Sequence, residues 1–250
     1  MGFWPLTRRV VKDSDIVLLV IDVRMPEMSR NRELERIASL HGRKLVYVFN
    51  KIDLVSESYL KNIRIKYNEG FFVSGIKNIG INYLKRHLMI IAKKIRIKGP
   101  RIGVVGYPNV GKSAIINALA KRAKAKISAT AGTTKGIQFI RAGSLLILDS
   151  PGVIPYGDSS IMLGVMAAKN PEKIRNVEKV AFETIKMLID YDKAILEREY
   201  EIEMSEDKDY DVILEDIGRK KGFLLKGGVI DVHRTALLVI RDWQKGKFRL

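Results

Sequence analysis

The chain has 250 residues, of which 46% are hydrophobic and 29% are charged, a balance that allows one substantial core and a smaller appended unit. It contains no cysteine, which excludes a disulfide framework and a cysteine-based zinc site, so we expect no zinc and a cytoplasmic protein. No apolar stretch is long enough to span a bilayer, and we expect no membrane association.

The first informative motif follows a short β-branched and aromatic run at residues 45–49. It reads Asn50-Lys51-Ile52-Asp53, the pattern N-K-x-D, at the end of an expected strand. The carboxylate of Asp53 can accept two hydrogen bonds from the ring N–H and the exocyclic amine of guanine, a pattern that adenine does not offer. Asn50, Lys51 and Asp53 are therefore candidate residues for binding a guanine nucleotide.

A second loop suited to the base edge follows the apolar residues 71–73. Its candidate binding residues are Ser74 and Gly75, although Ser74 can also be read as a loop serine that caps the next helix. We expect that helix over residues 79–97, followed by a linker at residues 98–100.

Residues 106–113 spell G-x-x-x-x-G-K-S directly after the apolar run 102–105, which predicts a strand, a phosphate-binding loop and a helix. Gly106 and Gly111 permit turns that direct backbone N–H groups at phosphate oxygens. Lys112 would bring a positive charge to the β- and γ-phosphates, and the Ser113 hydroxyl would bind Mg²⁺. The other candidate contacts of this loop are Asn109, Val110 and Ala114.

A third nucleotide motif begins at Asp149, which ends the apolar run 145–148 and opens the pattern D-x-x-G that closes at Gly152. Asp149 fits an acidic partner of Mg²⁺ that acts through a water, and the segment from Asp149 to Gly152 fits the D-x-x-G of a GTPase switch. D-x-x-G alone is usually a turn, but here it follows a strand downstream of a phosphate loop.

The guanine motifs thus precede the phosphate loop, although GTP-binding proteins normally have them after it. This order resembles the circularly permuted GTPases, most closely the YlqF/RbgA type (HSR1/MMR1-related), which assists assembly of the large ribosomal subunit. The resemblance extends to residues 15–26 and 29–31 and to residues 217–222 and 227–231. It implies an α/β fold in which residues 1–168 form a circularly permuted P-loop GTPase domain and residues 169–250 form a small helical, RNA-binding domain.

The resemblance also implies how the site works. Thr134 matches the switch threonine that meets Mg²⁺ only when the γ-phosphate is present, with Thr133 less favoured, so the candidate catalytic residues are Lys112, Thr134 and Gly152. Val153 follows Gly152 where many small GTPases carry a water-orienting glutamine, so we expect slow basal hydrolysis that a ribosomal partner stimulates. Asn109 resembles an asparagine that lets related GTPases bind K⁺, or is simply an asparagine that tolerates a tight turn.

The positive charge is unevenly distributed. Residues 70–148 contain no Asp or Glu but fifteen Lys or Arg, more than a triphosphate needs, which indicates an RNA partner unless these are only solvated cations on helix faces. We expect further helices over residues 176–191 and 231–243, the latter capped by Asp231. A second group of cations is our candidate rRNA contact: Arg219, Lys220, Lys221 and Lys226.

Together these features predict a factor that binds GTP or GDP with Mg²⁺, and in one reading K⁺, hydrolyses GTP, and acts on a precursor of the large ribosomal subunit through rRNA. One alternative is a GTP-dependent RNA- or protein-binding switch outside ribosome assembly, with incidental hydrolysis. A P-loop enzyme that phosphorylates a small molecule is disfavoured by the paired guanine motifs and the basic surface.

Overall fold

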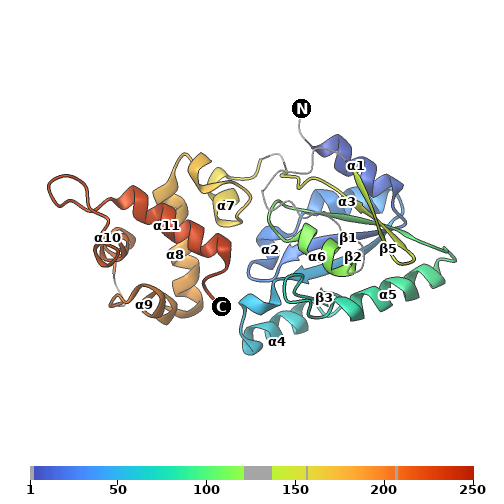
Figure 1. Ribbon diagram of the computed structural model, residues 1–250, viewed down its shortest axis with the longest axis horizontal. Helices are drawn as coiled ribbons and strands as arrows, with labels where there is room; N and C mark the ends of the chain where they lie inside the picture. The colour runs from blue at the N-terminus through green and yellow to red at the C-terminus, as the bar shows by residue number, and fades with distance from the viewer. Residues whose placement is uncertain (1–2, 121–136, 156, 206–207) are drawn as a thin grey trace. The chain divides into compact units, whose positions relative to one another are not determined.

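The computed structural model describes residues 3–120, 137–155, 157–205 and 208–250. The chain forms two compact units, residues 1–157 and 158–250 (Figure 1). Among the helices of the described residues, none combines the length and the apolar character that a membrane span requires.

A six-stranded sheet organises the first unit, in the strand order β3, β2, β1, β4, β6, β5. Neighbouring strands run parallel except β5 and β6, which pair antiparallel. The carboxyl ends of the parallel strands therefore meet at one edge of the sheet, where α/β folds bind their ligands. The strands are β1 (Ile16–Asp22), β2 (Lys44–Asn50), β3 (Phe71–Phe72), β4 (Arg101–Gly106), β5 (Gln138–Ala142) and β6 (Leu145–Asp149).

Helices flank this sheet in the pattern of a doubly wound fold (Figure 1). Every residue of β1 is buried, as expected for a central parallel strand that is covered on both faces. Helices α1 and α3 pack against each other, and so do α5 and α6. The helices of this unit are α1 (Trp4–Asp13), α2 (Pro26–Ser29), α3 (Arg32–Leu40), the 3₁₀ helix η1 (Ile52–Leu54), α4 (Glu57–Lys66), α5 (Ile81–Lys94) and α6 (Lys112–Leu119).

The helix expected over residues 79–97 is shorter at both ends than the sequence suggested, because α5 is bounded by left-handed residues. Gly80 precedes it at φ 73°, and Arg96 follows it at φ 58°. Backbone in this region cannot continue a right-handed helix, so the apolar pattern extends beyond the helix itself.

The second unit is helical. Its elements are α7 (Ser160–Val165), η2 (Pro171–Lys173), α8 (Val177–Asp192), α9 (Ala194–Tyr200), α10 (Tyr210–Lys220) and α11 (Val232–Lys245). The expected cap of the last helix is present, since the Asp231 carboxylate accepts a hydrogen bond from the Arg234 amide at 2.9 Å.

The two units divide at residues 157 and 158, upstream of the boundary after residue 168 that the sequence suggested. The reason is the packing of α7 with the second unit. The fully buried Trp243 donates its indole N–H to the carbonyl of Val165 at 2.7 Å, and Gly164 lies against the Val180 side chain. These contacts join α7 to α8 and α11.

Candidate functional site

The loop between β4 and α6 has the backbone shape of a phosphate cradle. Gly106, Asn109 and Gly111 have φ values of 147°, 59° and 96°. A Cβ on Gly106 would lie 2.6 Å from the carbonyl oxygen of Val20, so only glycine fits there. The left-handed conformation of Asn109 agrees with the tight-turn reading of that residue, and its role as a K⁺ ligand stays a prediction.

Lys112 lies inside this loop with only 8% of its surface exposed. Its ammonium group donates to the carbonyl oxygens of Tyr107 at 2.7 Å and Gly106 at 3.3 Å. Burial lowers the pKa of Lys112 to about 8, although the negative charge of Asp149 opposes that shift. A buried ammonium whose partners are mainly neutral carbonyls is poised to meet a stronger anionic acceptor.

Asn50 joins the three loops that the sequence marked as separate motifs. Asn50 is the last residue of β2 and is 3% exposed. Its amide group donates to the Val110 carbonyl of the phosphate loop at 2.9 Å, and its oxygen accepts from the Gly75 amide of the second base loop at 3.0 Å. A Cβ on Gly111 would lie 2.1 Å from Asn50 Nδ2, so the glycine is needed for this approach.

The two base-edge loops lie side by side. Ile52, next to Asp53, donates its amide to the Val73 carbonyl at 3.3 Å, immediately before Ser74. A Cβ on Gly75 would lie 2.8 Å from the backbone of Ala114, so this loop also reaches the first turn of α6.

Ser74 is buried, and its hydroxyl accepts a hydrogen bond from the Lys77 amide at 3.0 Å. That bond stabilises a turn ahead of Gly80, so Ser74 does not cap α5 as one reading of the sequence proposed.

Beside these loops lies a buried ionic cluster whose importance the sequence did not reveal. Lys51 has a left-handed backbone at φ 70°, and its ammonium lies 2.7 Å from Asp22 Oδ2. Arg24 donates to both oxygens of the same carboxylate, at 3.1 Å and 2.8 Å. The cluster therefore ties the end of β1 to the N-K-x-D segment.

Asp22 and Lys51 each favour the charged form of the other, which opposes the effect of burial on both groups. Burial alone would raise the pKa of Asp22, but the positive charges of Lys51 and Arg24 outweigh it, so the pKa is held well below its usual range. Burial lowers the pKa of Lys51, and Asp22 opposes that shift. In the sequence, Asp22 lay within residues 15–26, a segment of the family resemblance, but the sequence assigned it no role.

The D-x-x-G segment lies directly on the phosphate loop. Asp149 is buried at the end of β6, and Val153 donates its amide to the Gly106 carbonyl at 3.3 Å. A Cβ on Gly152 would lie 2.7 Å from the Pro108 nitrogen and 2.9 Å from the Lys112 ammonium. The glycine permits this close approach.

Ser113 is exposed at the start of α6, where a hydroxyl can serve a metal ion. Within the described residues no group of three or more His, Asp or Glu could hold a metal by itself. The oxygens of Ser113 and Asp149 nevertheless fit Mg²⁺ that arrives with a nucleotide, because that ion takes few protein ligands. Thr133 and Thr134 lie outside the described residues.

Comparison with known proteins identifies the family. Residues 5–157 match the family described as RsgA GTPase, and residues 101–217 match the family described as 50S ribosome-binding GTPase. The first match covers more than half of the chain and includes every motif of the site. The chain belongs to the circularly permuted GTPases.

Two relatives and one solved fold illustrate the similarity. An uncharacterized GTP-binding protein of Methanocaldococcus jannaschii is 36% identical over 97% of this chain and 65% of that protein. Nucleolar GTP-binding protein 2 of Neurospora crassa is 31% identical over 98% of this chain and 40% of that protein. The chain therefore spans less than two thirds of the length of these relatives.

The solved structure is YlqF from T. maritima, whose GNP-bound form is 24% identical, covering 94% of this chain and 89% of that chain with a TM-score of 0.57. A GDP-bound YlqF structure gives 23% identity, 94% and 91% coverage, and a TM-score of 0.59. This likeness confirms the predicted fold, a circularly permuted GTPase domain with helices behind it.

Proposed function

We propose that this chain binds GTP with Mg²⁺ and hydrolyses it to GDP and phosphate as a factor in assembly of the large ribosomal subunit. The observation that carries the nucleotide-binding part of the proposal is a pair of hydrogen bonds at Asn50, whose amide donates to the Val110 carbonyl and whose oxygen accepts from the Gly75 amide. They join the guanine motif, the second base loop and the phosphate loop into one site.

Each loop has a chemical task in this proposal. Asp53 reads guanine through its two carboxylate oxygens, supported by the loop of Ser74 and Gly75. The phosphate-loop amides and Lys112 bind the β- and γ-phosphates. Mg²⁺ held by Ser113, by Thr134 and, through water, by Asp149 would neutralise part of the phosphate charge.

Hydrolysis requires a water to attack the γ-phosphate while negative charge spreads over its oxygens. Lys112 stabilises that charge from inside the loop, and the amide of Gly152 would contact the γ-phosphate when it is present. Val153 is buried and apolar, so the residue after Gly152 offers no side chain that could orient the water. We therefore infer a slow basal rate that a bound partner raises, with K⁺ at Asn109 as a further contributor.

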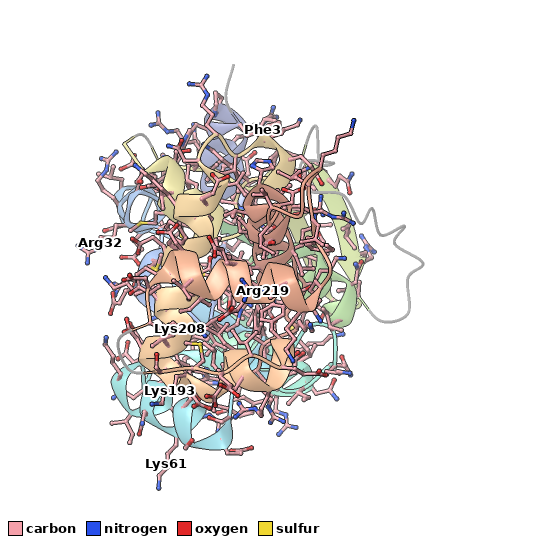
Figure 2. All side chains as sticks on the ribbon, turned by 90° about the vertical axis from the view of Figure 1, so that its left-hand side faces the viewer. Phe3, Arg32, Lys61, Lys193, Lys208 and Arg219 are labelled. Carbon is pink, nitrogen blue, oxygen red and sulfur yellow. The ribbon has the colours of Figure 1, made fainter. Side chains whose placement is uncertain are left out.

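Large-subunit RNA is the partner we propose for the second unit, as an RNA-binding domain. The description of one matching family, 50S ribosome-binding GTPase, supports this choice. So does the basic end of α10, where Arg219 is 68% exposed in its side chain and only loosely paired with Asp216, at 3.5 Å. Figure 2 shows Arg219 on the face of this unit that is turned toward the viewer. Lys220 is the exposed last residue of α10, and Lys221 and Lys226 are exposed in the segment that follows it.

The cytoplasmic location expected from the sequence stays a prediction. The relatives named nucleolar GTP-binding protein 2 and nuclear/nucleolar GTPase 2 carry a nuclear location in their names.

The deciding experiment is the rate of GTP hydrolysis with and without purified large ribosomal subunits, in potassium and again in sodium. Strong stimulation by large subunits, absent with small subunits, is the expected result. No stimulation in either salt would leave the alternative, a GTP-dependent RNA- or protein-binding switch with incidental hydrolysis.

The assignment of the base is tested separately with Asp53→Asn. The amide can donate where the carboxylate only accepts, so this variant should lose affinity for GTP and gain affinity for xanthosine triphosphate. Equal loss for both nucleotides would remove Asp53 from the base-reading role.

A further inference from the structure

Three aromatic rings gather at the edge of the sheet in the first unit. Phe71 belongs to β3, the edge strand, and its ring centroid lies 5.8 Å from Tyr83 and 4.8 Å from His87, both on α5. The rings of Tyr83 and His87 are 6.1 Å apart, one helical turn from each other. Tyr83 is nevertheless 61% exposed, so most of its ring faces solvent. A tyrosine whose role was only to cover the edge strand β3 would not need to expose most of its ring.

The stripe continues along α5. Tyr83, His87, Ile90 and Lys94 recur at the spacing of one helix face, and Ile90 is 43% exposed. Below, the α5 surface means Phe71, Tyr83, Arg86, His87, Ile90, Lys93 and Lys94.

Within the part of the chain that the structure describes, the cations of the α5 surface have no ion-pair partner. Arg86, Lys93 and Lys94 are exposed, and no described residue forms an ion pair with any of them. Elsewhere in the same unit several arginines are paired, such as Arg101 with Asp15 at 3.0 Å. Helix α5 contains no acidic residue, and the nearest acid along the chain is Glu69, two residues before Phe71.

Exposed aromatic rings beside unneutralised cations favour one class of ligand. The phosphates of a nucleic acid supply the missing negative charge, and an unpaired base supplies a flat face for an exposed ring. In duplex RNA the bases are stacked on each other and are not available to a tyrosine. An acidic peptide would satisfy the cations but would leave the rings without a partner.

We propose that the α5 surface binds an unpaired segment of RNA, with a base stacked on Tyr83 and phosphates bound by Arg86 and Lys94. This inference rests on the proposed function in taking RNA as the partner, and adds a contact on the GTPase unit that is separate from the basic end of α10. It also specifies that the RNA is single-stranded at this contact.

The test uses the full chain bound to GDP and a fluorescent oligouridylate of about twelve nucleotides, a length within the usual range for single-strand sites. Anisotropy titration gives the dissociation constant. Tyr83→Ala should raise it about tenfold, in the range of one lost base stack, whereas Tyr83→Phe should stay within about twofold of wild type. Phe139→Ala removes a comparably exposed ring, 63%, from β5 and should change nothing.

The electrostatic part has its own variant pair. Arg86→Glu should reduce the slope of log affinity against log salt by at least about 0.7, the contribution of one phosphate on a single strand. Lys61→Glu makes the same charge change on α4, where the lysine points away from the helix into solvent (Figure 2), and should leave the slope unaltered. Unchanged GDP affinity in every variant verifies that the first unit is folded.

Three results would overturn the inference: wild-type affinity in Tyr83→Ala, an equal effect of that variant on duplex RNA of the same length, or displacement of the RNA by oligoglutamate at similar concentration. The proposed function is judged independently by stimulation of the wild-type GTPase by large subunits. If stimulation persists while Tyr83→Ala binds RNA normally, only the α5 surface is misassigned.

Discussion

Replacing Asp22 with asparagine should destabilise the first unit more than any change in a surface ion pair. The side chain of Asp22 is 2% exposed, that of Arg24 0%, and that of Lys51 15%. The substitution leaves two buried cations without a counter-charge, which costs about 3 to 5 kcal/mol when nothing relaxes. Lys51 can move partly into solvent and asparagine keeps one acceptor, so we expect a loss near the lower limit, about 3 kcal/mol.

The assay is urea unfolding of nucleotide-free protein at neutral pH, followed by tryptophan fluorescence. The chain has two tryptophans, one in each unit, so a Trp243→Phe background leaves Trp4 to report on the first unit. The matched control is Asp13→Asn, which breaks the exposed pair of Asp13 with Arg9 at 3.4 Å and should cost less than about 0.5 kcal/mol.

The pH dependence gives the effect a sign. Because the pKa of Asp22 is lowered in the folded state, its contribution is fully present above its unfolded value of about 3.9 and disappears as the pH falls below it. The gap between wild type and Asp22→Asn should therefore be constant near neutrality and shrink in acid. A loss below about 1 kcal/mol at neutral pH, or a gap that does not shrink in acid, would refute the reasoning.

Three further changes probe the loops around Asn50. Asn50→Ala leaves the Gly75 amide and the Val110 carbonyl without their partner, so it should lower the free energy of unfolding by about 2 kcal/mol. It should also weaken GDP binding in a fluorescent-nucleotide titration, and retained affinity would contradict the linking role. Gly111→Ala adds a Cβ 2.1 Å from Asn50 at a residue with φ 96°. It should lower the unfolding temperature more than Gly42→Ala, because Gly42 also has positive φ, 60°, but its Cβ would have no atom within 4 Å. Equal losses would mean that backbone strain alone matters. Lys112→Met removes a buried ammonium and should abolish triphosphate binding while making the nucleotide-free protein about 1 kcal/mol more stable at neutral pH. Since the lowered pKa of Lys112 makes wild-type stability rise with pH above about 8, this advantage should fade toward pH 10, and an advantage that persists would contradict the assignment.

Much of the fold was readable because its signals are local. The apolar run at residues 102–105, followed by two glycines and a lysine at fixed spacing, predicts a strand, a loop and a helix without any distant contact. The cap by Asp231 was predictable for the same reason, since an N-cap depends on the next three residues.

The linking contacts were not readable because they depend on strand pairing. Asp22 lies opposite Asn50 only through the register of β1 on β2, and residue order does not specify which strands become neighbours. The sequence therefore marked Asn50 as a base contact but could not show that it ties Val110 to Gly75. The position of α7 was missed similarly, because its attachment depends on Trp243, far along the chain.

The position of β1 in the middle of the sheet has a consequence for synthesis on the ribosome. Its residues pair on one side with β2, which follows soon after, and on the other with β4, which emerges only after α5 has been made. Until then one edge of a strand that is apolar up to Asp22 has no partner, a state that favours premature association with other chains. The arrival of β4 closes that edge and delivers the phosphate loop in the same step, so a newly made chain protects its central strand as it gains the loop.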